Sequence, residues 1–308
     1  MLFNKLRANP QYFIFCVVIK LFILMTTYVV LNMTLGNAEN VLIYSLISFF
    51  MISPNPRVQL IVLLLCSLVT VFLYKVTLLN IVLMILLGAY WGGLMTVLIH
   101  NTSHEIIKPR WLNRVFGEIA SFFLTIGFIN FLYIHILHHV HSDEEKDPHP
   151  NIEGLNLIDY LASMGRNVSK VFKNYLPNQV CKGPLQYKLL VLSVLLNKLL
   201  IFQIFLLIFG PKVFTFFNLT CIISSQFLFA YINFYTHPNK DHGRNELINL
   251  DESYLDKSLN RLFFGILYHD NHHKYPKAAN PMKYAQSNQK TTNLDLSSLS
   301  SHAFKELK

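Results

Sequence analysis

Three short histidine clusters carry most of the chemistry that this sequence can support. Their members lie three or four positions apart, and they are His100, His104, His135, His138, His139, His269, His272 and His273. On a helix, residues at these spacings share a face, so each cluster presents two or three imidazoles on a common stripe. Converging neutral imidazoles suit iron, copper, zinc or nickel. The clusters therefore predict a metal site.

The number of potential ligands favours two redox metals over one zinc ion. Zinc hydrolysis needs three or four ligands and a carboxylate base, and the pair His104-Glu105 lacks the second histidine of an HExxH motif. Attack on an unactivated C–H bond by O2 needs a redox metal with open positions, and two irons can share the electron load. We therefore expect two iron ions, with O2 as co-substrate.

The remainder of the chain is apolar enough to predict an integral membrane protein. Hydrophobic residues make up 53%, charged residues 14%, and the mean hydropathy is +0.38. A helix needs about 20 apolar residues to cross a bilayer. The apolar helices expected on this basis are 11–33, 41–52, 58–74, 78–99, 187–210 and 213–235. The shorter run 41–52, which ends at Ser53-Pro54-Asn55-Pro56, is either a short span or a re-entrant piece.

The net charge of +9 follows the expected membrane topology. If the N-terminus is cytoplasmic and every apolar run crosses, most of the 26 lysines and arginines fall on the cytoplasmic side. No basic stripe interleaves with aromatic residues outside the apolar runs, so a nucleic-acid partner is not expected. The four cysteines have no paired spacing, which argues against a disulfide framework.

The same topology places all three clusters on one face, provided that the apolar segment 118–134 does not cross the membrane. We expect this segment to lie in the interface or to dip and return. The expected fold is an all-α integral membrane protein, in which transmembrane helical hairpins are capped by a cytoplasmic, histidine-rich di-iron helical domain. Residues 1–285 would form this membrane domain, followed by a polar C-terminal tail, 286–308.

Two of the clusters resemble the histidine boxes of membrane fatty acid desaturases. The stretch 135–149, with its Asp-x3-Asp-Pro sequence, looks like the second box of the stearoyl-CoA-type Δ9 enzymes, and 268–276 is similar to their third box. Asn233-x3-His237 has the spacing of their additional motif. The first box has three intervening residues, the shorter form seen in other membrane desaturases, hydroxylases and carotenoid oxygenases. The resemblance covers roughly 90–280.

This resemblance implies a set of site residues. The implied metal ligands are His100, His104, His135, His138, His139, His237, His269, His272 and His273, with Asn233 bound through a water molecule. Asp143 and Asp147 would orient ligand imidazoles and fix their tautomers. His141, His149 and His242 lie close by and are further candidates for binding metal or substrate.

The activity implied by the resemblance is O2-dependent desaturation of a lipid acyl chain, carried by fatty acyl-CoA or by an acyl-lipid. The sequence has no recognisable haem-binding or iron–sulfur motif, so electrons are expected from a separate ferredoxin- or cytochrome b5-like donor. The membrane would be a bacterial inner membrane or the endoplasmic reticulum, with the histidine boxes cytoplasmic. We expect the acyl tunnel to be lined by the spans and by 122–133.

Two other functions are compatible with histidine clusters in a membrane protein. A lipid or carotenoid hydroxylase or ketolase of the same superfamily would use the same metals. A non-enzymatic haem or metal-transport protein is the remote alternative. Transport sites lie near the middle of the membrane, and haem needs only one or two axial histidines. The clusters instead lie at or beyond the ends of the apolar runs, which disfavours this alternative.

Overall fold

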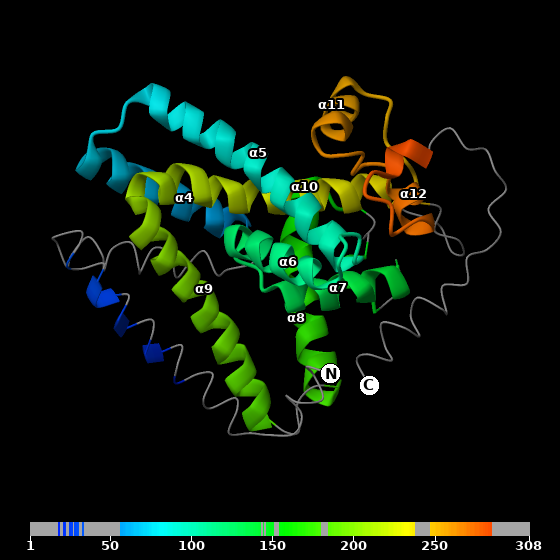
Figure 1. Cartoon of the computed structure of the whole chain (residues 1–308), viewed down its shortest axis with the longest axis horizontal. Coiled ribbons are helices and arrows are strands. Elements are labelled where there is room, and N and C mark those ends of the chain that lie inside the picture. Colours follow the sequence, from blue (N-terminus) through cyan, green and yellow to red (C-terminus); the bar gives the residue numbers. More distant parts are fainter. Residues whose placement is uncertain are drawn as a thin grey trace. The chain divides into compact units, whose positions relative to one another are not determined.

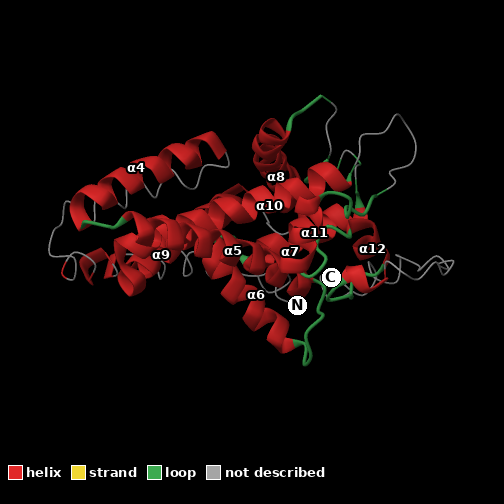
Figure 2. Ribbon diagram, turned by 90° about the horizontal axis from the view of Figure 1, so that it is seen from above, coloured by secondary structure: helices red, strands yellow, loops and turns green. Residues whose placement is uncertain are grey.

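The computed structural model describes residues 56–142, 144, 146–150, 154–179, 184–237 and 247–284, together with isolated positions between 18 and 33. Every regular element of at least four residues in this part of the chain is a helix, and one isolated bridge pairs Asn249 with Tyr268. Figures 1 and 2 show these helices and the loops between them. The expected helix 41–52, most of 11–33 and the tail 286–308 lie outside the described residues.

Three segments of the described chain are long and apolar enough to cross a membrane: Arg57–Tyr74, Leu78–Ser103 and Lys198–Thr236. They fall on α4 (Pro56–Tyr74), α5 (Leu78–Ser103), the end of α9 (Pro184–Val213), the π-helix η1 (Phe214–Asn218) and α10 (Leu219–Thr236). Large apolar side chains such as Phe72, 86% exposed, point outward from these helices. Such surfaces are stable in contact with lipid. The chain is an all-α membrane protein, as the sequence predicts.

Two of these helices differ from the predicted boundaries. Helix α5 continues past residue 99 and ends at Ser103, so His100 lies within the helix and His104 in the turn that follows. Near the end of α9 the backbone leaves the helical conformation at Gly210, with φ 75° and ψ 172°. Glycine accepts this positive φ without strain. The position coincides with the end of the expected helix 187–210, just before the expected helix 213–235.

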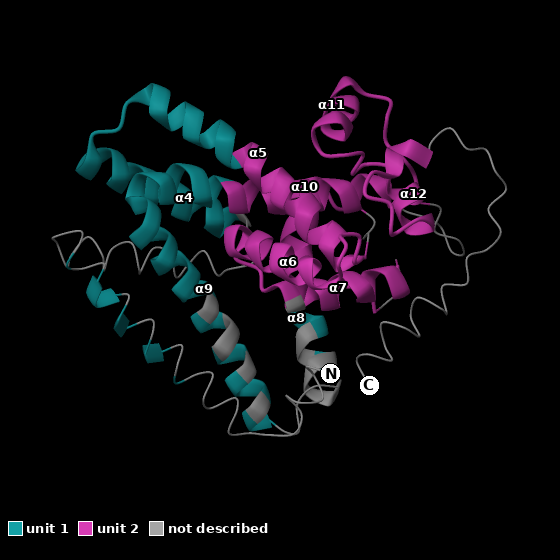
Figure 3. Cartoon of the chain, viewed as in Figure 1, with its two compact units in different colours: residues 1–88, 169–220, 298–308 teal, residues 89–168, 221–297 magenta. Residues whose placement is uncertain are grey.

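The chain divides into two compact units, shown in different colours in Figure 3. Among the described residues, the first unit contains α4, the start of α5, α9 and η1. Thr70 of α4 and Thr215 of η1 are joined by a buried hydrogen bond of 2.8 Å between their hydroxyl groups. Phe214 packs edge-on against Phe202, with ring centroids 5.7 Å apart. In an apolar span, a hydrogen bond like that between Thr70 and Thr215 satisfies two polar groups and holds neighbouring helices together.

The second unit contains the remaining helices of the described chain, arranged around α10. They are the end of α5, α6 (Trp111–Leu124), α7 (Phe128–Val140), the start of α8 (Leu157–Gln179), α11 (Tyr254–Leu262), α12 (His269–Lys274) and the 3-10 turn η2 (Pro281–Tyr284). Cys221 of α10 packs with apolar residues of α5, α6 and α7. Leu228 and Ile232 pack against the segment before α12, and Ala230 packs against α8. Helix α10 is thus the common core of this unit.

The apolar segment 118–134 is divided between two short helices. Helix α6 has 14 residues and α7 has 13, and the chain turns between them at Thr125, which has a left-handed φ of 55°. The two helices pack closely where Gly117 faces the ring of Phe128. A crossing helix needs about 20 residues, so neither helix can span a bilayer by itself. The course of this segment relative to the membrane stays a prediction.

A close contact between α5 and α10 provides the first test of this packing. A Cβ atom at Gly92 would overlap the Ser224 hydroxyl and the Cys221 carbonyl group. We expect Gly92→Val to destabilise the protein by about 1–3 kcal/mol, the usual cost of overpacking a core. The measurement is the melting temperature in detergent. Leu87→Val, at a position of α5 that is 59% exposed, is the control. Equal melting temperatures for the two variants would contradict this contact.

Candidate metal centre

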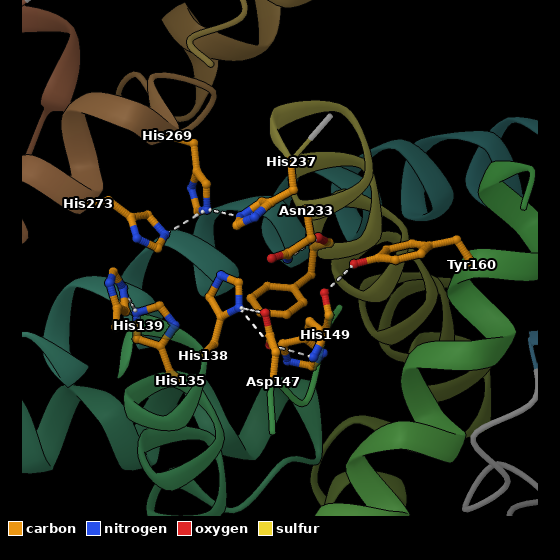
Figure 4. A network of polar contacts seen from close by, with 11 residues as sticks. His135, His138, His139, Asp147, His149, Tyr160, Asn233, His237, His269 and His273 are labelled. Carbon is orange, nitrogen blue, oxygen red and sulfur yellow. Dashed lines mark hydrogen bonds and ion pairs between the residues drawn. The ribbon is translucent and has the colours of Figure 1, made fainter. Parts of the chain in front are cut away.

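Four segments of the second unit bring nine imidazoles together. The end of α5 and its following turn supply the first box, α7 supplies the second, and α12 supplies the third. His237 follows directly after α10. The nine histidines are those that the sequence predicts as ligands: His100, His104, His135, His138, His139, His237, His269, His272 and His273. Figure 4 shows part of this constellation.

The nine histidines form two groups, each able to hold one metal ion. The five-histidine group contains His100, His104, His135, His139 and His272. The four-histidine group contains His138, His237, His269 and His273. Within each group, one ring nitrogen from every member lies within 4.8 Å of those of all the other members.

The division between the groups follows helix geometry. Residues four apart stay together: His135 and His139 of α7 belong to one group, and His269 and His273 of α12 belong to the other. Adjacent positions on a helix are rotated by about 100°. His138 therefore points away from His139 and joins the other group, and α12 likewise sends His272 to the five-histidine group. Helices α7 and α12 each supply histidines to both groups.

In the five-histidine group, the Nε2 atoms make more close contacts than hydrogen bonds between neutral rings can account for. The Nε2–Nε2 separations are 2.7 Å for His104 and His135, 3.2 Å for His135 and His139, and 3.1 Å for His139 and His272. A neutral imidazole nitrogen carries one proton or one lone pair, not both. At most two of these three consecutive contacts can then be hydrogen bonds. The arrangement instead fits lone pairs directed at a common centre.

The four-histidine group has the same spacing. The Nε2 atom of His269 lies 3.0 Å from that of His237 and 3.1 Å from that of His273. A metal–nitrogen bond is about 2.0–2.1 Å long, so nitrogens on adjacent vertices of an octahedron lie about 3.0 Å apart. The buried Nε2 atom of His138 has no hydrogen-bond partner in the described structure. The imidazole nitrogens, the distances between them and the unpartnered Nε2 atom of His138 all fit a bound transition-metal ion.

Burial favours the neutral form, which is the form that binds metal, in six of the imidazoles outside the spans. Desolvation lowers the pKa of His104, His139 and His273 well below the usual value of 6.5. The neighbouring imidazoles lower the pKa further, because two positive charges would repel each other at this range. The pKa values of His135, His269 and His272 are lowered for the same reasons.

Asp147 contacts His138 and orients its ring, whereas the role of this pair at a metal ion stays a prediction. The two carboxylate oxygens of Asp147 lie 2.9 and 3.1 Å from His138 Nδ1. Burial raises the pKa of Asp147, but His138 and the backbone N–H of His149 outweigh this effect and lower it overall. The ionised carboxylate can only accept, so the proton sits on Nδ1 and the Nε2 lone pair faces the four-histidine group.

Asn233 lies beside both groups, at the wall of a small cavity. The cavity is also lined by Thr96, Phe229, Ile232 and Ile266, and by the histidines His100, His135, His138 and His269. Asn233 donates from Nδ2 to the Phe229 carbonyl (2.8 Å), while its buried Oδ1 has no hydrogen-bond partner in the described structure. An unpaired buried acceptor is suited to a bound water molecule. The water ligation expected for Asn233 stays a prediction.

Several residues near the boxes lie apart from the two groups. His141 bonds the exposed Glu144 (2.9 Å) and belongs to neither group. Asp143 and His242 lie outside the described residues. His149 is buried, and its ring packs 5.8 Å from that of His138, yet it is not a member of the four-histidine group. The segment 122–133 contributes Phe131, which stacks on His135 with centroids 5.4 Å apart.

The third box is held by asparagines that sequence reasoning did not identify. Asn249 and Asn271 exchange side-chain hydrogen bonds, with Asn249 donating to Asn271 (3.1 Å) and also accepting from the Asn271 backbone (3.1 Å). Asn260 accepts from the backbone N–H of Leu267 and donates to the Leu250 carbonyl group. These bonds satisfy buried backbone groups in a loop with little regular structure. No local motif signals them, because each partner is distant in the sequence.

The lowered histidine pKa values predict acid lability of the protein stripped of metal. In the unfolded chain these histidines titrate near 6.5, whereas in the folded protein they resist protonation. The unfolded state then binds more protons below about pH 6.5, so stability falls as the pH decreases below this value. We expect the melting temperature of chelator-treated protein to decrease from pH 7.5 to pH 5. A constant melting temperature would contradict buried neutral imidazoles.

Comparison with known proteins agrees with this site. No curated protein and no solved structure matches the chain. The family model described as fatty acid desaturase matches residues 77–282, a range that includes all nine histidines, Asn233 and Asp147. The match covers more than half of the 308 residues. The chain therefore belongs to the fatty acid desaturase family.

Proposed function

We propose that this protein is an O2-dependent di-iron enzyme that introduces a double bond into a lipid acyl chain, carried by fatty acyl-CoA or by an acyl-lipid. The observation that carries the proposal is the convergence of nine imidazoles, five buried and four partly buried, into two groups. Family membership supports an oxidoreductase of the desaturase and hydroxylase superfamily. The choice of iron rests on redox chemistry, because zinc has no second oxidation state with which to activate O2.

The residues at the site have separate tasks in this reaction. Bound iron supplies one-electron redox chemistry and a position for O2. The five- and four-histidine groups hold one ion each, and Asp147 keeps His138 in the ligating tautomer. Phe229, Ile232 and Ile266 give the cavity an apolar wall. Contact of an alkyl chain with such a wall is favourable, because it removes apolar surface from water. The buried Asn233 amide is placed to hold a water molecule.

The overall reaction requires a reductant that this site does not contain. Removal of two hydrogens from adjacent methylenes and reduction of O2 to two waters needs two further electrons and two protons. We propose a ferredoxin- or cytochrome b5-like donor as their source, since the sequence has no haem or iron–sulfur motif. The exposed Lys277 beside the third box provides positive charge that favours an acidic donor, whereas Lys274 is paired with Asp270.

We further propose that the two histidine groups face the cytoplasm, in a bacterial inner membrane or the endoplasmic reticulum. The division of 118–134 into α6 and α7 supports a non-crossing course, because each helix is too short to span. Helix α6 also exposes Trp111, Val115 and Ile119 at a spacing of four, an apolar stripe typical of a helix lying in the membrane interface.

Hydroxylation is the second candidate reaction. The first box, His100-x3-His104, has the shorter spacing seen in membrane hydroxylases and carotenoid oxygenases. Desaturation and hydroxylation share the first hydrogen abstraction and differ in the fate of the substrate, which placement can decide. A hydroxylated or ketolated product contains oxygen from O2, whereas a desaturated product contains none.

The products can be identified by expression in a host of known lipid composition, with a compatible electron donor, followed by mass spectrometry of total fatty acids. We expect a new species two mass units lighter than a host fatty acid. His139→Ala should abolish it, because this residue belongs to the five-histidine group. His141→Ala is the matched control and should retain the product. A product heavier by one oxygen would favour hydroxylation, and an unchanged acyl profile would contradict acyl-chain chemistry.

The non-crossing course of α6 and α7 predicts a labelling pattern. In a variant without native cysteines, Glu105→Cys and Val140→Cys place single thiols before α6 and at the end of α7. Both positions are 43% exposed. We expect a membrane-impermeant maleimide to label both thiols from the same side of sealed vesicles. Labelling from opposite sides would separate His104 from His139 by a bilayer and would contradict the proposed site.

A further inference from the structure

A continuous chain of hydrogen bonds connects one histidine of the four-histidine group to a tyrosine on α8. His138 Nδ1 bonds the Asp147 carboxylate at 2.9 Å, and the same carboxylate oxygen accepts from the backbone N–H of His149 at 2.7 Å. The carbonyl group of His149 accepts from the Tyr160 hydroxyl at 2.9 Å. Figure 4 shows these contacts in sequence. The peptide units of residue 149 thus lie between the carboxylate and the phenol.

Tyr160 anchors the loop 147–149 to helix α8. Its side chain is 0% exposed and packs in a cluster with Leu161, Met164 and Ala230. The start of α8 is held by Asn156, whose side-chain oxygen accepts from the backbone N–H of Asp159 at 3.0 Å. The Tyr160 hydroxyl is therefore carried by a helix that packs on α10, and the loop 147–149 is attached to it.

We propose that Tyr160 is a positioning residue for the metal ion of the four-histidine group. It holds the His149 carbonyl group, which orients the His149 N–H toward Asp147, and Asp147 in turn orients His138. The inference rests on the proposed metal-binding function and extends it to a residue that belongs to neither histidine group. The His149 ring reinforces the same loop, since it packs between His138 and Phe229 with centroids at 5.8 and 5.1 Å.

The effect of Tyr160 should be confined to one of the two metal ions. In the five-histidine group, the Nδ1 atoms of His135 and His272 are buried without a hydrogen-bond partner in the described structure. His100 has only a long contact, 3.4 Å, to Asn101. No comparable carboxylate contact to these three rings occurs among the described residues. Greater mobility of the loop 147–149 therefore affects His138 directly. It does not directly affect the rings of the five-histidine group.

The test is the rate at which ferrous iron is lost from purified full-length protein to an excess of chelator under anaerobic conditions. Tyr160→Phe keeps the ring and removes only the hydroxyl. We expect one of the two irons to leave about tenfold faster than in the native protein, and Asp147→Asn to cause an equal or larger increase, in the usual range for such partners. The release rate of the other iron should stay unchanged.

Tyr231→Phe is the matched control. The Tyr231 hydroxyl also bonds a carboxylate, that of Asp256 at 2.9 Å, in the same unit. Asp256 caps α11 and contacts no ligand histidine in the described structure. We expect both iron release rates in this variant to equal those of the native protein.

Variants in which one of the two histidine groups is weakened identify which iron is affected. His100→Ala weakens the five-histidine group, so the iron that remains should respond to Tyr160→Phe. His237→Ala weakens the four-histidine group, so its remaining iron should not respond. Equal acceleration of both irons by Tyr160→Phe would indicate general loosening of the fold and overturn the proposal, as would native release rates. Native protein that binds no iron would instead refute the di-iron function itself.

Discussion

Imidazole nitrogens about 3 Å apart impose one requirement on this structure, because they can share a small space only when they are uncharged. Nine such rings meet in the second unit, and protonation of several would place positive charges in direct contact. Complete or partial burial removes much of the water that would stabilise those charges and so favours the neutral form. The surrounding helices must therefore exclude water from the rings and still hold their lone pairs toward two common centres.

This requirement explains features of the fold that lie away from the histidines. Gly92 allows α5 and α10 to approach closely, which helps to bring the ends of these helices, and hence His100 and His237, to the same region. The turn at Thr125 lets α7 pack against α6, with the second box near its end. The Asn249–Asn271 pair holds α12, a helix of 6 residues that is too short to be stable without such contacts.

The sequence predicts the parts of this site that depend on local spacing. Apolar runs identify α4, α5, α9 and α10, and histidines three or four apart identify the nine rings that the structure gathers; that they bind metal stays a prediction. Local spacing cannot show that His138 and His139 serve different groups, since this depends on the position of α12. Nor can it identify Tyr160, whose partner is the carbonyl group of His149, or the break at Thr125, where a threonine adopts a conformation more usual for glycine.

Helix α7 supplies histidines to both groups, and this affects the spacing between the two groups. His138 and His139 are neighbours in one helix, with ring centroids 5.9 Å apart, and His272 and His273 repeat this arrangement on α12 at 5.7 Å. Each of these two helices thus presents neighbouring side chains to different groups, and the spacing of the groups depends on both helices. A distortion of either helix would therefore disturb both groups at once.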